Sequence, residues 1–252
     1  MNKAKYLLPL ALLALLIGAQ QAHSQVSISL PRIEVGDKGA NDVNLSTGLQ
    51  VLFLLTALSL APAFLLLMTS FTRIVIVLSL VRTSLAMHQT PPTQIVIGIA
   101  LFLTFFVMTP TWQAVNSDAV QPYMAGDINY KVAIEKGLVP IRDFMFKQTR
   151  EKDLMLMVQM ARMEKPDNET DVPTHVLMPA FIISELNTAF RMGFLLFIPF
   201  IVIDMVIASI LMSMGMMMLP PVMISLPFKI LLFVMADGWA LIVKSLVSGF
   251  NY

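Results

Sequence analysis

The chain has 252 residues, of which 57% are hydrophobic and only 13% are charged, with a mean hydropathy of +0.76. Soluble domains carry about 25% charged residues, so this composition is that of a membrane protein. The net charge of +1 gives no reason to expect nucleic acid as a partner. The absence of cysteine excludes disulfides and thiol catalysis, and three histidines far apart in sequence do not suggest a metal centre; no cofactor is expected.

Residues 1–24 have the organisation of a signal peptide. Two lysines near the start precede an apolar run at residues 7–17, and small residues follow at Ala22 and Ser24. We expect cleavage near Ser24, which places the mature N-terminus and the polar lead of residues 25–44 outside the cytoplasm. An uncleaved short helix is the alternative.

Residues 45–110 are predicted to form the first of two long helical hairpins. The apolar run from Leu45 to Met87 is about twice as long as the roughly 20 residues that span a bilayer. Because proline removes a backbone donor and crowds the preceding turn, we expect a break at Pro62. One helix then covers residues 64–87, and a second covers residues 94–108.

Residues 111–173 differ in character from the rest of the chain. They hold more than half of its charged residues, yet apolar residues recur at a helical period between residues 141 and 161. We predict two or three soluble amphipathic helices, with Pro140 in the first turn of one and Thr149 capping the next. An acidic surface turn follows at residues 167–171.

Residues 174–252 are predicted to form the second hairpin. Its first helix covers residues 179–219 with a kink at Pro199, two prolines reverse the chain, and its second helix covers residues 222–247. The expected fold class is therefore an all-α membrane protein, with two long kinked hairpins flanking a soluble helical insert. Threading from an external N-terminus places the insert in the periplasm and both hairpin tips in the cytoplasm.

Charges within the apolar segments are costly unless each has a partner or a task. Eight are candidates for such roles: Arg73, Arg82, Glu185, Arg191, Asp204, Lys229, Asp237 and Lys244. On one continuous helix, the last two lysines and the aspartate between them would share an arc of about 80°. This pattern favours an ion-pair stripe that docks the helix to a neighbour, and a polar seam lining a conduit is the alternative.

The three charges on the predicted helix over residues 179–219 need partners from elsewhere. Glu185 and Arg191 lie about 120° apart around their helix, so they do not pair with each other. Asp204 has no cation nearby in sequence. Partners on another subunit are one interpretation, and an intramolecular partner such as Arg73 or Arg82 is the other.

Methionine is concentrated at the tip of the second hairpin. Seven of the 20 methionines lie between Met205 and Met223, three of them consecutive at residues 216–218. Methionine usually fills irregular gaps in a core. Its flexible thioether could also close around an irregular object, so a tip that faced a pore would form a soft gate.

Enzymatic chemistry has little support in the sequence. Ser184 and Glu185 lack a nearby histidine or lysine, and no phosphate-binding glycine loop is present. Asp204 and Asp237 could serve as proton sites of a self-contained proton-coupled transporter or ion channel. They could also form the aspartyl pair of an intramembrane hydrolase, which is a third hypothesis.

Several segments carry a resemblance to one known family. Residues 179–193 (PAFIISELNTAFRMG), and Pro227-Phe228-Lys229 followed by Asp237-Gly238-Trp239, look like the two signature segments of the FliP family. Residues 68–80, 89–92 and 100–106 are similar to its first hairpin. Members of this family are core export-gate proteins of the bacterial flagellar type III secretion system, with counterparts in virulence systems.

This resemblance implies a function that composition does not indicate. The protein would be a non-enzymatic, pore-forming subunit in the bacterial inner membrane, at the flagellar basal body. Five copies would assemble with FliQ and FliR, with FlhB and FlhA nearby, to pass unfolded flagellar proteins out of the cytoplasm. The family's hairpins resemble an assembled protein core more than ordinary membrane spans.

The resemblance also implies roles for particular residues. The methionine-rich loop would be the gasket that closes the channel, and its residues are Met214, Met216, Met217 and Met218. The signature charges would lie at or near subunit contacts, and these are Glu185, Arg191, Lys229 and Asp237.

Overall fold

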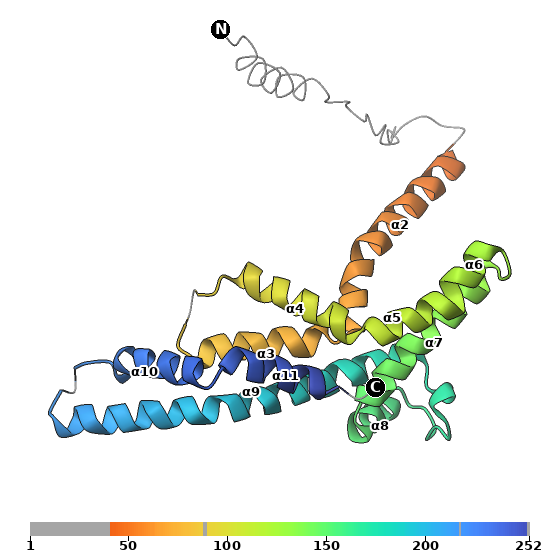
Figure 1. Ribbon diagram of the computed structural model, residues 1–252. Helices are drawn as coiled ribbons and strands as arrows, with labels where there is room; N and C mark the ends of the chain where they lie inside the picture. The colour runs from red at the N-terminus through yellow and green to blue at the C-terminus, as the bar shows by residue number, and fades with distance from the viewer. Residues whose placement is uncertain (1–40, 88–89, 217, 251–252) are drawn as a thin grey trace, which may run out of the picture. The chain divides into compact units, whose positions relative to one another are not determined.

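The computed structural model describes residues 41–87, 90–216 and 218–250. The expected signal peptide and nearly all of the expected lead lie outside these residues. The described part is helical and contains no strand, which confirms the all-α class (Figure 1). The chain divides into two units, with the boundary between residues 59 and 60.

The first described helix corrects the predicted break at Pro62. Helix α2 (Asn41–Leu67) continues through this proline, and α3 (Phe71–Ser84) begins only after a break at residues 68–70. At the break, the Thr69 hydroxyl donates to the Leu66 carbonyl at 2.8 Å and accepts from the Phe71 amide at 3.4 Å. A side chain that satisfies backbone groups in this way competes with the helix and ends it.

The next helix agrees with the prediction to within one residue at each end. Helix α4 (Thr93–Val107) packs against α3. It is followed by α5 (Thr109–Val115), a π-helical turn at Asn116–Val120 and α6 (Gln121–Ala125), and these bend away from α4 by 56°. Pro110 lies in the first turn of α5, where proline starts a helix without losing a hydrogen bond.

The predicted insert is helical, but its helix boundaries differ from those expected. Helix α7 (Tyr130–Gln148) is capped by Asn129, whose side chain accepts from the Val132 amide at 3.0 Å. Pro140 therefore lies inside α7 and not in a first turn. Thr149 ends α7 instead of capping α8 (Glu151–Met160), because its hydroxyl donates back to the Met145 carbonyl at 2.6 Å.

The acidic turn expected near residues 167–171 is a short 3-10 helix, Glu169–Asp171. The Asn168 side chain and that of Asp171 cap each other's backbone amides in a capping box. Arg142 of α7 holds this turn through hydrogen bonds to the carbonyls of Glu169 (3.2 Å) and Val172 (2.6 Å). The turn is thus fixed against the start of the long helix that follows.

The C-terminal part contains one very long helix and one broken helix. Helix α9 (Thr174–Ser213) has 40 residues and is continuous through Pro179 and Pro199. The predicted single helix over residues 222–247 is wrong. It is divided into α10 (Pro221–Met235) and α11 (Gly238–Ser248), which bend by 64°.

The break between α10 and α11 has a local cause. Asp237 adopts a left-handed conformation with φ of 49°, which ends a right-handed helix. A Cβ atom on Gly238 would lie 2.3 Å from the ring of Phe233, so only glycine lets this ring pack against the turn. The common arc assigned to Lys229, Asp237 and Lys244 assumed an unbroken helix and does not exist.

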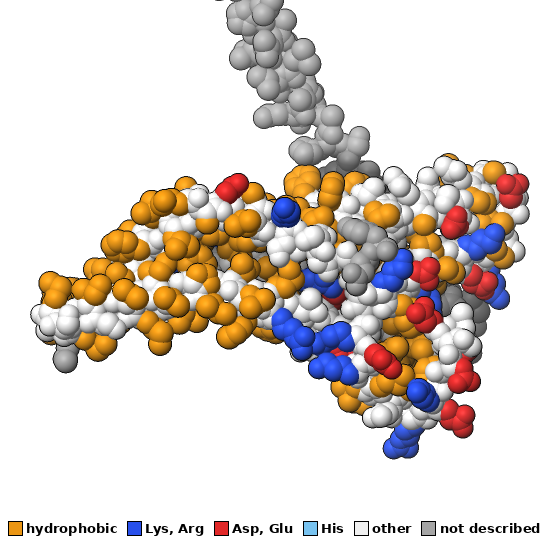
Figure 2. Space-filling view, turned by 60° about the horizontal axis from the view of Figure 1, so that its bottom comes forward, with side chains coloured by type: hydrophobic (Ala, Val, Ile, Leu, Met, Phe, Trp, Pro, Cys, Tyr) orange, Lys and Arg blue, Asp and Glu red, His pale blue; other side chains and the backbone are white. Residues whose placement is uncertain are grey.

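Helices α3 and α9 form the centre of the second unit. They pack against each other, α4 covers α3, and α7, α8 and α10 pack on α9 (Figure 1). Hydrophobic side chains cover the part formed by α3, α4, α9 and α10, whereas charged side chains gather over α5–α8 (Figure 2). One unit therefore combines an apolar helical region with a charged helical region.

Two described helices are long and apolar enough to cross a membrane, over Gly48–Leu67 and Thr174–Ser213. The number rises to four if the bent pairs α4 with α5–α6 and α10 with α11 each count as one span. Only 11% of the most hydrophobic stretch in Thr174–Ser213 is buried within the chain. These apolar surfaces need a cover that the isolated chain does not supply.

The contact between α3 and α9 predicts the effect of a single methyl group. A Cβ atom on Gly193 would lie 2.2 Å from Leu80 Cδ1 and 3.2 Å from Leu80 Cβ, whereas one on Gly98 of α4 would meet nothing within 4 Å. We expect Gly193→Ala to destabilise the purified protein by about 1–3 kcal/mol through overpacking. Gly98→Ala should be neutral or stabilise it by up to about 1 kcal/mol. Thermal unfolding in detergent measures both, and equal shifts for the two variants would contradict the close contact.

Candidate functional site

A carboxylate on α9 lies at the centre of a buried polar network. The Glu185 side chain is fully buried and receives two N–H groups from Arg73 of α3, with Nε at 2.9 Å from one carboxylate oxygen and Nη2 on the other. Two parallel bonds between a guanidinium and a carboxylate fix both distance and orientation. The sequence left the partner of Glu185 open, and the structure assigns it to Arg73 within the same chain.

The rest of the Arg73 guanidinium connects further elements. Nη1 donates to the Gly249 carbonyl at 2.8 Å, Nη2 donates to Gln148 Oε1 at 3.3 Å, and the group lies 4.0 Å from the centre of the Phe250 ring. Arg73 thus joins α3, the end of α7, α9 and the residues after α11. Lysine has neither the fork nor the plane required for these contacts.

The neighbouring residue of α9 makes a second connection, to α8. The Ser184 hydroxyl donates to Asp153 Oδ2 at 2.7 Å and accepts from the Arg150 amide at 3.0 Å. Arg150 Nη2 lies 2.6 Å from the same carboxylate oxygen. Burial raises the pKa of Asp153, but the bonds from Ser184 and Arg150 and the charges of Arg150 and Lys152 outweigh it, so the pKa lies below its ordinary value of 3.8.

A further ion pair joins the two helices of the second hairpin. Lys229 Nζ of α10 lies 2.6 Å from Asp204 Oδ2 of α9 and donates to the Ser84 carbonyl of α3 at 3.3 Å. The Ser225 hydroxyl donates to the other Asp204 oxygen. The Ser84 carbonyl belongs to the C-terminal turn of α3, where the helix dipole favours a cation. The sequence analysis missed this pair because it sought a cation for Asp204 nearby in sequence, and helix pairing brings Lys229 to it.

The other predicted charges have different surroundings. Arg82 is half-buried and donates to the Pro91 carbonyl at 3.3 Å and the Thr93 hydroxyl at 3.1 Å, which fastens the loop before α4. Arg191, Asp237 and Lys244 are exposed and form no ion pair with any residue that the structure describes. The eight candidates thus comprise two buried pairs, one loop anchor and three open charges.

The structure does not bring Asp204 and Asp237 together as a proton-binding or catalytic pair. Asp204 of α9 binds Lys229 of α10, whereas Asp237 is exposed at the break after α10. Within residues 41–87, 90–216 and 218–250, no group of three His, Asp or Glu side chains could hold a metal ion.

The methionine-rich tip connects α9 to α10. Gly215 turns the chain with φ of 74°, and Met214 and Met218 are exposed, the latter by 98%. Met216 is half-buried, and Met217 lies outside the described residues. The thioethers of Met214 and Met218 therefore project from the tip and do not fill the hairpin's own core.

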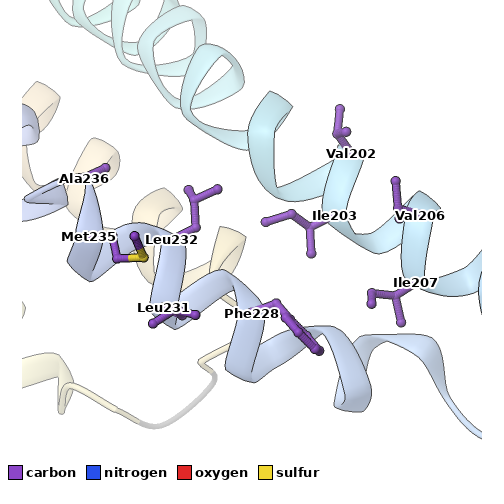
Figure 3. Close-up of a pocket in the computed structure, with 9 residues that line it drawn as sticks. All are labelled: Val202, Ile203, Val206, Ile207, Phe228, Leu231, Leu232, Met235 and Ala236. Carbon is purple, nitrogen blue, oxygen red and sulfur yellow. The ribbon is translucent and has the colours of Figure 1, made fainter.

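Sequence reasoning missed an apolar groove of about 620 Å³ between α9 and α10. Figure 3 shows side chains of both helices around it, with Ile203 and Leu232 directed toward the space between them. Its lining contains no polar side chain and consists of Val202, Ile203, Val206, Ile207, Phe228, Leu231, Leu232, Met235 and Ala236. The one sequence signal for it is that both helices stay apolar on several faces.

Long apolar helices joined by buried ion pairs define a membrane-associated helical protein. Residues 54–246 match the FliP family. The chain is 59% identical over 207 residues to flagellar biosynthetic protein FliP of Bacillus subtilis, covering 82% of this chain and 94% of that one. It is 50% identical to FliP of Borreliella burgdorferi (88% of each chain) and 44% identical to FliP of Aquifex aeolicus (96% of this chain, 99% of that one).

The chain therefore belongs to the FliP family of flagellar biosynthetic proteins, and it is a component of the flagellar export apparatus and not an enzyme.

Two lysines in apolar helices offer a matched test of the buried charges. Lys229 is paired and buried, whereas Lys244 is exposed and unpaired within the described part of the chain. We expect Lys229→Met to cost about 3 kcal/mol, because it leaves Asp204 without its cation; this is the lower end of the range for broken buried pairs, since that carboxylate is 30% exposed. Lys244→Met should change stability by less than about 0.5 kcal/mol. Thermal unfolding measures the stability of both variants, and a Lys229→Met variant as stable as the unmodified protein would refute the structural role of the pair.

Proposed function

We propose that this protein is a pore-forming core subunit of the flagellar type III export gate, which passes unfolded flagellar proteins across the bacterial inner membrane. The observation that carries the proposal is the contrast between a well-satisfied interior and a large unsatisfied surface. Inside one chain, Arg73 pairs with Glu185 and Lys229 pairs with Asp204. Outside, large side chains are exposed along both signature segments, including Phe190, Phe194, Phe228 and Trp239.

Such a surface suits assembly with other protein chains. Lipid tails could cover the apolar side chains, but hydrocarbon could not neutralise Arg191, Asp237 and Lys244. Further copies of the chain, five in all, and the partners FliQ and FliR would supply both apolar contacts and counter-charges, with FlhB and FlhA nearby. The same arrangement agrees with the family resemblance.

The proposed orientation places the mature N-terminus and the insert in the periplasm. The gathering of charged side chains over α5–α8 supports an aqueous environment for this region (Figure 2). The methionine tip, at the other end of α9, would then face the channel or the cytoplasmic side. There, Met214 and Met216–Met218 would form a gasket that closes around a passing chain and reseals behind it.

The assembly is tested by co-expression with and without FliQ and FliR, followed by native mass spectrometry of the detergent-purified complexes. We expect a multi-copy complex of this chain that takes up both partners. A monomer or dimer whose mass is the same with and without FliQ and FliR would contradict the gate and favour a self-contained transporter.

The gasket is tested by removing Met216–Met218 in cells that express the whole gate. Because flexible thioethers would no longer fill the constriction, we expect ion leakage to rise. The matched control is Met160→Ser, which changes an exposed methionine on α8 away from the tip and the groove and should leave leakage unchanged. Equal leakage from the deletion and the unmodified gate would refute the gasket.

A further inference from the structure

Two open charges of opposite sign lie in the apolar region of this chain. Arg191 of α9 is exposed between Phe190 and Phe194, whose exposed fractions are 58% and 66%. Asp237 is exposed directly after α10, next to the exposed Met235. A single charge facing hydrocarbon costs about 3 kcal/mol, so both surfaces favour a protein cover that carries the opposite charge.

The register of α9 and α10 places these two charges at similar heights. Asp204 meets Lys229, and Phe200 packs on Phe233 with ring centres 6.4 Å apart. Each step down α9 thus matches a step up α10, so the helices are antiparallel. Helix α10 ends at Met235, level with residue 198, and Asp237, two residues further along the chain, lies near the level of residue 196. At 1.5 Å per residue, Arg191 lies about 7 Å further along the axis.

We propose that Arg191 of one copy pairs with Asp237 of the next copy, in a head-to-tail contact between copies of this chain. The inference rests on the proposed function, because it requires a homo-oligomer. The two partners come from different surface patches, so the contact is heterologous and can repeat around a ring or spiral. An axial stagger of about 7 Å between neighbouring copies brings the guanidinium level with the carboxylate.

The apolar groove gives this contact a second element of complementarity. Shifting one copy by about 7 Å to align Arg191 with Asp237 also brings Phe194 to the height of residue 234, next to the groove residue Met235, and Ile198 to the height of residue 230, next to the groove residue Leu231. All side chains that line the groove are apolar, and both side chains offered to it are exposed and apolar (Figure 3). A second copy can therefore fill the groove while completing the ion pair at its end.

The absence of cysteine from the sequence permits a direct test. Arg191→Cys and Asp237→Cys are introduced together into the full chain, co-expressed with FliQ and FliR, and treated with a short bismaleimide. We expect a ladder of two, three and more linked copies, because each copy then carries one half of two successive contacts. Each single-cysteine variant should remain unlinked.

Charge reversal supplies a second, independent readout. We expect Arg191→Glu or Asp237→Arg alone to lower the yield of multi-copy complex by about tenfold or more, and the double reversal to restore it. Lys136→Glu, which reverses an exposed cation of α7 outside the proposed contact, should leave the yield unchanged.

Several outcomes would overturn the inference. These are a link within one copy only, dimers from a single-cysteine variant, a link to another protein only, or a multi-copy complex indifferent to both reversals. In each of these cases the unmodified chain still forms its complex, so the proposed function stands. A chain that forms no multi-copy complex even without substitutions would overturn both.

Discussion

The bidentate pair between Arg73 and Glu185 is the interaction on which the apolar part of the structure depends. A buried ion pair contributes little net stability by itself, but either partner alone would be a charge without a counterion in an apolar interior. Helices α3 and α9 therefore have one arrangement in which both charges are satisfied. The remaining donors of Arg73 extend this constraint to Gln148 and Gly249, and Ser184 extends it to α8.

The second pair, Lys229 with Asp204, applies the same principle to α10. Its third partner is a backbone carbonyl at the end of α3, so the hairpin that carries the methionine tip is tied to the same central helix. Between the two pairs, Gly193 lets α9 approach Leu80 of α3. Polar contacts at both ends and close apolar packing in the middle hold α9 on α3 and set the position from which the tip projects.

Much of the architecture could be predicted from sequence, because hydropathy reports whole helices well. The ends of α4, the helical insert and the turn at Pro220 follow from apolar runs and proline positions. Both missed breaks arise from effects that hydropathy does not register. The Thr69 hydroxyl takes up backbone groups after α2, and Asp237 adopts a left-handed conformation while Gly238 makes room for Phe233. The helix boundaries expected at Pro62 and Pro140 are absent, because a helix that is capped elsewhere can tolerate the loss of one hydrogen bond.

The sequence marked eight charged residues in the apolar segments but could not assign their partners. Helical angles correctly showed that Glu185 and Arg191 do not pair, whereas the pairing of Glu185 with Arg73 and of Asp204 with Lys229 depends on tertiary packing. The shared arc of three charges failed because it required α10 and α11 to be one helix. The groove between α9 and α10 has no polar residue to mark it, so only the helix packing reveals it.

The distance along the chain between Arg73 and Glu185 has a consequence for biosynthesis. Their 112-residue separation means that Arg73 leaves the ribosome well before its counterion. At roughly 5–20 residues per second, the guanidinium waits on the order of 5–20 seconds. During this interval, α3 cannot take up its final apolar packing without burying an uncompensated charge, so this packing waits until α9 emerges. The order of synthesis thus favours late, concerted packing of the two helices.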